Sequence, residues 1–263
     1  IFQTAPFFDF DTRVTGSNDA AAIEGADLVI ITAGIPRKPG MSRSDVLHTN
    51  IAILDGILDD VLRHAPDCML LLVSNPVDIL TWHAWRRTGW ERSRVFGQAG
   101  VLDSSRMAAF IAMETGFSTR DITTIVLGGH GDTMVPLPRF CTINGIPVSH
   151  FIDEHRLQQI IARTRLGGAD ILALRKNSSA YDAPGAAVAT MVDAISHDRR
   201  RIVPTVVVLE GEYGERSVAM GVPCVLSRRG MESIIEMPLN DLELQLFHDS
   251  SEAVRADIQR LVS

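Results

Sequence analysis

The chain has 263 residues, of which 46% are hydrophobic and 22% charged, and this composition is typical of a soluble globular protein. The formal net charge of -7 argues against a general nucleic-acid-binding surface. The longest apolar runs, at 28–34 and 68–74, are far shorter than the roughly 20 residues of a membrane span, and no signal peptide is evident. The three cysteines are far apart and match no metal or redox spacing. We therefore expect buried thiols, no metal site and a cytoplasmic location.

The first part of the chain alternates predicted strands and helices. Apolar runs and glycine or proline stops predict strands at 12–17, 27–34, 68–76 and 94–100. Helices are predicted at 18–26, with Asn18 or Asp19 as N-cap, at 44–64 and at 77–89. Near-continuous apolar strands joined by helices indicate an open, mostly parallel α/β sheet.

After about residue 98 the pattern changes to α+β. Helices are predicted at 103–116, 153–175 and 184–197, and strands at 122–129, 139–150, 202–216 and 221–237. The last 20 residues are predicted to form a helix that turns four apolar side chains inward, namely Leu246, Val254, Ile258 and Leu261. We expect one domain over 1–98 and a second over 99–263.

His130 lies in the glycine-rich stretch LGGHGDTMVPL, residues 127–137. A strand leads into this loop, so the imidazole could face a ligand and exchange a proton near neutral pH. Alternatively, His130 is a structural or solvated histidine like the other seven.

The segment GVLDSSRM, residues 100–107, places Asp103 and Arg106 on one helix face. They are either a surface ion pair, or Asp103 orients His130 while Arg106 binds a carboxylate with its planar fork.

Two loops follow predicted parallel strands, at the edge where such sheets bind ligands. TAGIPRKPGMSR, residues 32–43, carries Arg37 and Arg43 and is either a solvated loop or a lid that closes on an anion. In LVSNPVD, Asn75 either caps a helix or donates a hydrogen bond to a ligand. A histidine, a carboxylate and three arginines together suit a small dicarboxylate and proton transfer at an oxygen.

These motifs, in this order, resemble those of the lactate/malate dehydrogenase family, and most closely its lactate-dehydrogenase-like bacterial malate dehydrogenases. The segments are TAGIPRKPGMSR, SNPVD, GQAGVLDSSR and GGHGDTMVPLPR, with SAYDAPGAA and GVPCVL further along. The resemblance implies a Rossmann-type doubly wound sheet followed by an α+β catalytic domain. It further implies NAD as cofactor, malate and oxaloacetate as substrates, a place in the tricarboxylic acid cycle, and a homodimer or homotetramer.

The resemblance also implies roles for individual residues. His130 would be the acid/base, paired with Asp103, and Arg43 would polarise the reacting carbonyl. Arg106 would bind the carboxylate beside the reacting carbon, and Arg37 would bind the second carboxylate, which distinguishes malate from lactate. Asn75 would lie between nicotinamide and substrate. The residues expected along the cofactor are Gly34, Asn50, Val73, Ser74 and Asn75.

One family feature is missing from the 263 residues: the G-x-G-x-x-G fingerprint and the acidic residue that follows it. We therefore expect the first βαβ unit to be absent, the strand at 12–17 to lack a partner, and the strand at 27–34 to form an apolar edge. A chain of this extent alone is expected to bind NAD weakly and to have little activity. One alternative is another 2-hydroxy-acid dehydrogenase, although Arg37 argues against lactate as its substrate. The other is a non-catalytic remnant that serves as an assembly partner.

Overall fold

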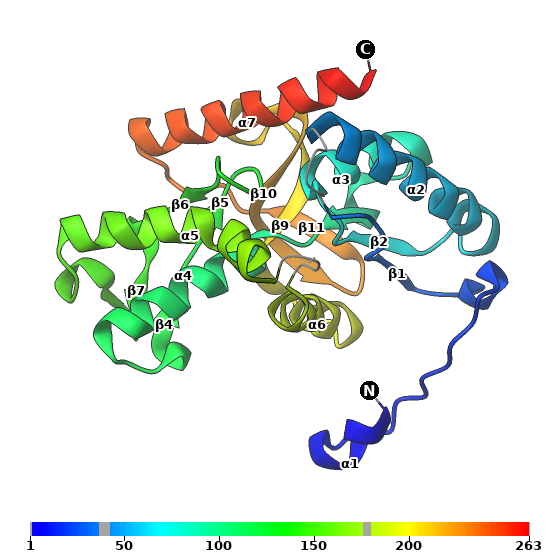
Figure 1. The fold of residues 1–263 in the computed structure, drawn as a ribbon, viewed down its shortest axis with the longest axis horizontal. Coiled ribbons are helices and arrows are strands. Elements are labelled where there is room, and N and C mark those ends of the chain that lie inside the picture. Colours follow the sequence, from blue (N-terminus) through cyan, green and yellow to red (C-terminus); the bar gives the residue numbers. More distant parts are fainter. Residues whose placement is uncertain (1, 37–42, 176–179, 263) are drawn as a thin grey trace.

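The computed structural model describes residues 2–36, 43–175 and 180–262. A six-stranded sheet with the order β1-β2-β3-β9-β10-β11 forms its centre (Figure 1). The first three strands are parallel and short: β1 Leu28–Ile31, β2 Met69–Leu72 and β3 Val95–Gly97. The parallel α/β arrangement predicted for the first part is therefore confirmed.

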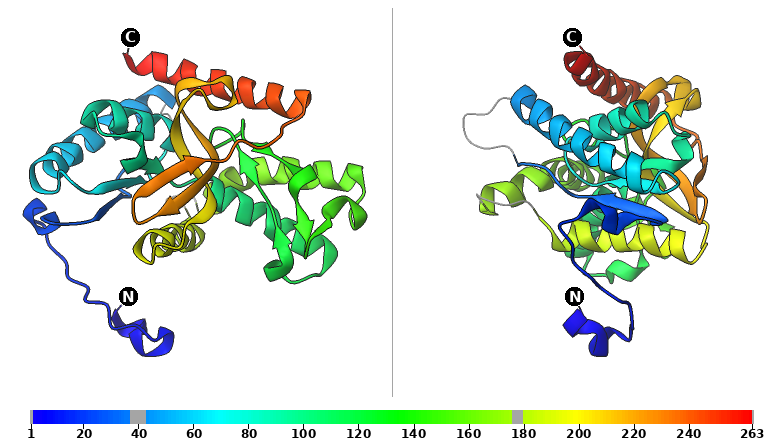
Figure 2. Two further views of the ribbon diagram at one scale, coloured as in Figure 1. Left: turned by 180° about the vertical axis from the view of Figure 1, so that it is seen from behind. Right: turned by 90° about the vertical axis from the view of Figure 1, so that its right-hand side faces the viewer.

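Helices follow these strands as the periodicity predicted. They are α2 Arg43–His64, α3 Val77–Thr88 and α4 Gly100–Thr115, with the short 3-10 turn η3 Arg92–Arg94 before β3. Gly89 and Gly116 end α3 and α4 in the left-handed conformation that glycine favours. Figure 2 shows α2 and α3 on one side of the parallel strands and α6 on the other.

The antiparallel strands of the second part extend the same sheet. They are β9 Arg201–Glu210, β10 Arg216–Ser227 and β11 Gly230–Ile234, and the turn η7 Glu212–Gly214 joins the first two. Gly97 of β3 pairs with Val206 of β9 in antiparallel orientation. Parallel and antiparallel strands thus share one continuous sheet.

A second, smaller body lies beside this sheet. Its helix α5 Glu154–Arg175 contacts α4, and its short strands are β4 Ile122–Thr123, β5 Val126–Leu127, β6 Val135–Pro136, β7 Thr142–Ile143 and β8 Ile146–Pro147. The turns are η4 Thr119–Asp121, η5 Pro138–Phe140 and η6 Val148–His150. A separate cluster of buried side chains, including Met107, Met134 and Ile160, fills this body.

The last two helices are α6 Asp182–Ser196 and α7 Asp241–Val262. Val254 and Ile258 are buried and Leu261 packs against the core, as predicted. Leu246 was predicted to face inward, and this is wrong, because it is 37% exposed and its neighbour Phe247 is fully buried instead. One residue of helical rotation, about 100°, accounts for the difference.

The first residues lie apart from the body in Figures 1 and 2. They form η1 Phe2–Thr4 and α1 Ala5–Phe8, and an irregular stretch follows. The next turn, η2 Ala20–Ile23, contacts α2, and its N-cap Asp19 accepts a hydrogen bond from the Ala21 N–H. The strand predicted at 12–17 is wrong: this stretch is irregular and exposed, because no neighbouring strand satisfies its backbone groups. The expected apolar edge is confirmed, since β1 is the outer strand and Ile30 is 38% exposed.

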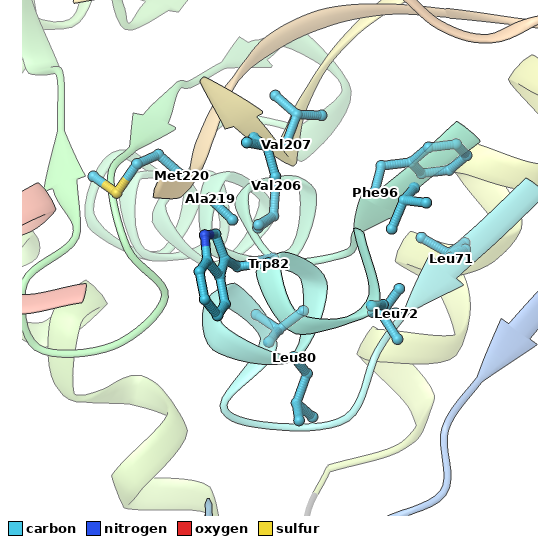
Figure 3. Packing of buried hydrophobic residues seen from close by; sticks show 14 of the residues in the cluster. Leu71, Leu72, Leu80, Trp82, Phe96, Val206, Val207, Ala219 and Met220 are labelled. Carbon is cyan, nitrogen blue, oxygen red and sulfur yellow. The ribbon is translucent and has the colours of Figure 1, made fainter. Parts of the chain in front are cut away.

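The main core lies between the sheet and its covering helices. Figure 3 shows Trp82 of α3 against Val206, Ala219 and Met220 of the antiparallel strands. The indole N–H of Trp82 donates to the Ser217 carbonyl at 3.0 Å. The three cysteines are free and buried, as predicted. No helix among the described residues is long and apolar enough to cross a membrane.

An ion pair ties η3 to the turn between β9 and β10. The two guanidinium NH2 groups of Arg92 donate to the two carboxylate oxygens of Glu212 at 3.1 and 2.8 Å. Burial alone would raise the pKa of Glu212, but hydrogen bonds from Arg92 and from the backbone outweigh it and lower the pKa to about 2. This stabilisation is complete above the unfolded value of about 4.3 and is lost as pH falls toward 2.

We therefore expect Glu212→Gln to lower the free energy of unfolding by about 1–2 kcal/mol at neutral pH. The deficit should shrink as the pH falls through the acid range, which urea unfolding at several pH values measures. Glu91→Gln, an exposed carboxylate on the neighbouring segment, is the control. A deficit that stays constant between neutral and strongly acidic pH would contradict this account.

Candidate active site

Three predicted residues meet at the first turn of α4. The Nδ1 atom of His130 lies 2.8 Å from Oδ2 of Asp103, and an NH2 group of Arg106 donates to Oδ1 of the same carboxylate at 3.0 Å. The side chain of Asp103 is 3% exposed and that of Arg106 is 11% exposed. Their burial excludes the surface ion pair that the sequence left open, and the spacing of three residues places both on one helix face as predicted.

The carboxylate of Asp103 fixes the protonation pattern of His130. Because a carboxylate only accepts hydrogen bonds, Nδ1 carries the proton and Nε2 of the neutral ring is free to accept one. Burial lowers the pKa of His130, but the charge and hydrogen bond of Asp103 outweigh it, and the net effect is a raised pKa. Nε2 can therefore take a proton from a ligand hydroxyl or return it.

Two other elements, β10 and α7, hold the start of the histidine loop, residues 128–134. Gly128 forms a two-way backbone bridge with Gly221 of β10, with both N–O distances 2.9 Å. The N–H of Gly129 donates to Oγ of Ser250 in α7 at 2.9 Å. Glycine lets α7 approach this closely, because a Cβ at Gly128 would lie 3.0 Å from Ser250 Oγ and one at Gly129 would lie 2.9 Å from Val254 Cγ2.

A second carboxylate, which the sequence analysis missed, also binds this loop. Asp78, in the first turn of α3, accepts the backbone N–H of His130 at 2.7 Å and is 3% exposed. Burial raises the pKa of Asp78 to about 6, although the neighbouring His130 lowers it. The signal in the sequence was an acidic residue at an apolar helix start, three positions after Asn75.

The loops after β1 and β2 meet through Asn50 of α2. Its side-chain oxygen accepts the Ile35 N–H at 2.8 Å, and its NH2 group donates to the carbonyls of Ile35 and Asn75 at 3.2 and 2.7 Å. Gly34 allows this close approach, because a Cβ there would lie 3.2 Å from the Asn50 oxygen. The predicted residues Asn50 and Gly34 thus shape the carboxyl edge of the parallel strands.

The loop after β2 carries the other predicted residues. Ser74 is buried and its hydroxyl donates to the Ala33 carbonyl at 2.6 Å, and half-buried Val73 packs against the main core. The side chain of Asn75 does not cap α3, whose N-cap is Pro76, and Asn75 is exposed. The helix-cap alternative for Asn75 is thereby excluded, and its side chain can reach a ligand.

The two remaining predicted arginines are only partly visible. Arg37 lies outside the described residues. Arg43 is the first residue of α2, so its backbone follows the loop directly, but its side chain is not described. The structure therefore brings together His130, Asp103 and Arg106 in one group. The loops at Gly34 and Asn75 form a second group. Helix α3 begins just after Asn75, and its Asp78 binds His130, so α3 connects the two groups.

A further residue that the sequence analysis missed is Gly167 in α5. A Cβ at this position would collide with Cδ of Arg106 and lie 2.8 Å from its Nε. Glycine therefore stands at the point where the Arg106 side chain crosses α5, although a glycine within a helix costs about 0.5–1 kcal/mol relative to alanine. Gly168, one position later, has no atom within 4 Å of such a Cβ.

We expect Gly167→Ala to displace the Arg106 guanidinium and to lower kcat/KM for the dicarboxylate that the sequence predicts as substrate by about tenfold to 100-fold. The increase in helix propensity partly compensates the strain, so thermal stability should change little. Gly168→Ala is the matched control and should leave kcat/KM unchanged. Equal kinetic constants for both variants would show that Gly167 does not position Arg106.

Comparison of the sequence with known protein families agrees with the family that the motifs predict. Residues 2–97 match the family model described as lactate/malate dehydrogenase, NAD binding domain, and residues 100–263 match that of the alpha/beta C-terminal domain. The chain belongs to the lactate/malate dehydrogenase family. It is 66% identical to a malate dehydrogenase of Thioalkalivibrio sulfidiphilus over 261 residues, which cover 99% of this chain and 85% of that protein.

Solved structures give the same result. The malate dehydrogenase of Salinibacter ruber has a TM-score of 0.93 at 41% identity, covering 99% of this chain and 83% of that one. The lactate dehydrogenase of Cryptosporidium parvum, complexed with lactic acid and NAD, has a TM-score of 0.94 at 34% identity, covering 99% and 84%. The predicted family, fold class, NAD cofactor and enzymatic function as a malate dehydrogenase are confirmed.

Proposed function

We propose that this chain transfers hydride reversibly between malate and NAD, giving oxaloacetate and NADH, with His130 as the acid/base. The observation that carries this assignment is the buried group His130–Asp103–Arg106, which offers a proton acceptor and a carboxylate-binding fork side by side. The experiment mixes the purified natural protein with NADH and oxaloacetate and follows the loss of NADH absorbance. Turnover supports the proposal, and a folded protein without turnover contradicts it and favours a non-catalytic remnant.

The chain's own residues handle the proton. When malate is oxidised, its hydroxyl proton passes to Nε2 of His130 as the C–H bond breaks, and Asp103 stabilises the imidazolium that forms. In the reverse direction the imidazolium returns the proton to the carbonyl oxygen of oxaloacetate. Bound NAD supplies or accepts the hydride.

The arginines hold the two carboxylates and the reacting oxygen. We propose that Arg106 binds the carboxylate next to the reacting carbon, with its own charge partly balanced by Asp103. Arg43 is proposed to polarise the carbonyl, where negative charge develops during reduction. Arg37 is proposed to bind the second carboxylate.

The loops after β1 and β2 suit the cofactor. They lie at the carboxyl ends of parallel strands, where open α/β sheets bind dinucleotides. Asn50 and Ser74 join the two loops from within, and Gly34 adds no side chain between them. We propose that Gly34, Val73, Ser74 and Asn75 line the cofactor, with Asn50 holding the loops in place.

Substrate choice gives a direct test of Arg37. A pyruvate methyl group would leave this guanidinium without a partner, and that penalty discriminates against pyruvate. We expect Arg37→Gln to lower kcat/KM for oxaloacetate by about 100-fold and to raise it for pyruvate. Steady-state kinetics with both substrates decide the matter, with Arg120→Gln on the exposed turn η4 as control. An unchanged preference would show that Arg37 does not read the second carboxylate.

The domain division, location and assembly are also proposed. The two family-model matches support an NAD-binding domain over 1–98 and a catalytic domain over 99–263. The buried free thiols suit the cytoplasm, and the activity suits the tricarboxylic acid cycle. We propose a homodimer or homotetramer, which light scattering after size exclusion would distinguish from a monomer.

A further inference from the structure

Asp78 contacts the backbone of His130, whereas Asp103 contacts its ring. Asp103 of α4 binds the ring at Nδ1, whereas Asp78 of α3 binds the backbone N–H of the same residue at 2.7 Å. Both carboxylates are nearly inaccessible, at 2% and 3% exposure. Two elements that follow different strands thus each place a carboxylate against one histidine.

The second oxygen of Asp78 makes this arrangement unusual. Oδ1 is buried and has no hydrogen-bond partner among the described residues. The groups that favour the Asp78 carboxylate are the charge of His130 and hydrogen bonds from the backbone of His130 and of Asp78 itself. A buried carboxylate with one oxygen left without a hydrogen bond is costly. An amide would make the same hydrogen bond at less cost, so the negative charge itself needs a reason.

The charged groups around His130 suggest that the Asp78 charge acts on the protonation of the ring. Asp103 and Asp78 both favour the imidazolium, and Arg106 opposes it. Exposed Asp132 is in the same loop, and Arg165 of α5 donates to the Met134 carbonyl at the loop's end at 3.1 Å. In the part of the site that the structure describes, Asp78 therefore adds to the effect of Asp103 and offsets Arg106.

We infer that Asp78 is a positioning residue that fixes the histidine loop at the backbone of His130 and, through its charge, favours the protonated ring that oxaloacetate reduction requires. The expected effect on kinetics rests on the proposed function, whereas the effect on the protonation of His130 does not. The position of Asp78 on α3 also has a structural consequence. Asp78 lies three residues after Asn75 and joins the loop after β2 to the histidine loop.

Asp78→Asn separates charge from hydrogen bonding, because the amide oxygen can still accept the His130 N–H. We expect oxaloacetate reduction by this variant to fall about tenfold above neutral pH but much less at mildly acidic pH. Malate oxidation, which uses the neutral ring, should instead persist to lower pH than in the natural protein. Asp78→Ala loses both functions and should lower kcat in both directions.

Glu24→Gln, an exposed carboxylate at the end of η2, controls for the loss of one charge. If Asp78→Asn lowers both directions by the same factor at every pH, Asp78 only supports the fold and the inference is overturned.

A second readout does not depend on activity. Nuclear magnetic resonance of the His130 ring nitrogens, without substrate, should show its titration at lower pH in Asp78→Asn than in the natural protein. An unchanged titration overturns the inference even if kinetics change. Because the wild-type assay with NADH and oxaloacetate tests the proposed function separately, failure of that assay and failure of the inference remain distinguishable.

Discussion

Replacing His130 by asparagine is expected to lower kcat for oxaloacetate reduction by about 10³-fold. Asparagine keeps a polar group near Asp103 but cannot donate and recover a proton at the Nε2 position. Arg106 still neutralises the Asp103 carboxylate in this variant, so the protein should fold, with a loss of about 1–2 kcal/mol in unfolding free energy. Stopped-flow or steady-state measurement of NADH consumption checks the loss.

His83 provides a matched control. Its Nε2 lies 2.7 Å from Oδ1 of Asp55, and its side chain is 18% exposed against 19% for His130. Asp55 lies on α2 and His83 on α3, and the ion pairs of Asp55 join it to His83 and Arg87, not to the histidine loop. His83→Asn therefore removes an equivalent histidine–aspartate pair and should leave kcat unchanged. Equal activity losses in the two variants would show that the effect comes from stability and not from proton transfer.

The same variant tests the pH dependence of stability. Since the pKa of His130 is raised in the folded state, its pair with Asp103 stabilises the fold fully below the unfolded value of about 6.5. The stabilisation is lost as pH rises through the raised folded value. The stability difference between the natural protein and His130→Asn should therefore shrink as pH increases, and a difference that grows would contradict the assigned pairing.

The second large effect is expected for Asp103→Asn, which should lower kcat by about 10²–10³-fold and raise KM for the dicarboxylate. Asp103 binds both His130 and Arg106, so removing its charge destabilises the imidazolium and frees the guanidinium to move. An asparagine amide facing Nδ1 can also impose the wrong ring tautomer. Kinetics and the pH profile of kcat/KM together report both consequences.

Asp55→Asn is the corresponding control, because Asp55 lies between His83 and Arg87 in the same way, at 2.7 and 3.8 Å. That cluster is more exposed, with Asp55 at 38%, so its removal should cost little stability and no activity. An Asp103→Asn enzyme with near-normal kcat would show that His130 does not depend on this carboxylate.

Local patterns predicted most of the fold. The apolar runs at 28–34 and 68–74 became β1 and β2, and the periodic stretch at 44–64 became α2 within one residue. Spacing alone also placed Asp103 and Arg106 on one face. These features depend on residues that are close together in the sequence, so local patterns are enough to predict them.

Long-range contacts account for what the sequence did not predict. The partners of Asp78 and Gly167 are 52 and 61 positions away along the chain, at His130 and Arg106, and no local pattern reveals such pairs. The stretch at 12–17 has strand-forming residues but no neighbouring strand to pair with. Leu246 and Phe247 differ by one helical position, which periodicity could not resolve.

A crystal structure of the natural protein with NADH and hydroxymalonate, a dicarboxylate that resembles malate, tests the central claim most directly. The account predicts that the ligand hydroxyl lies within hydrogen-bonding distance of His130 Nε2, with one carboxylate on Arg106 and the other on Arg37. A ligand bound elsewhere, with His130 and Arg106 facing away from it, would contradict the account.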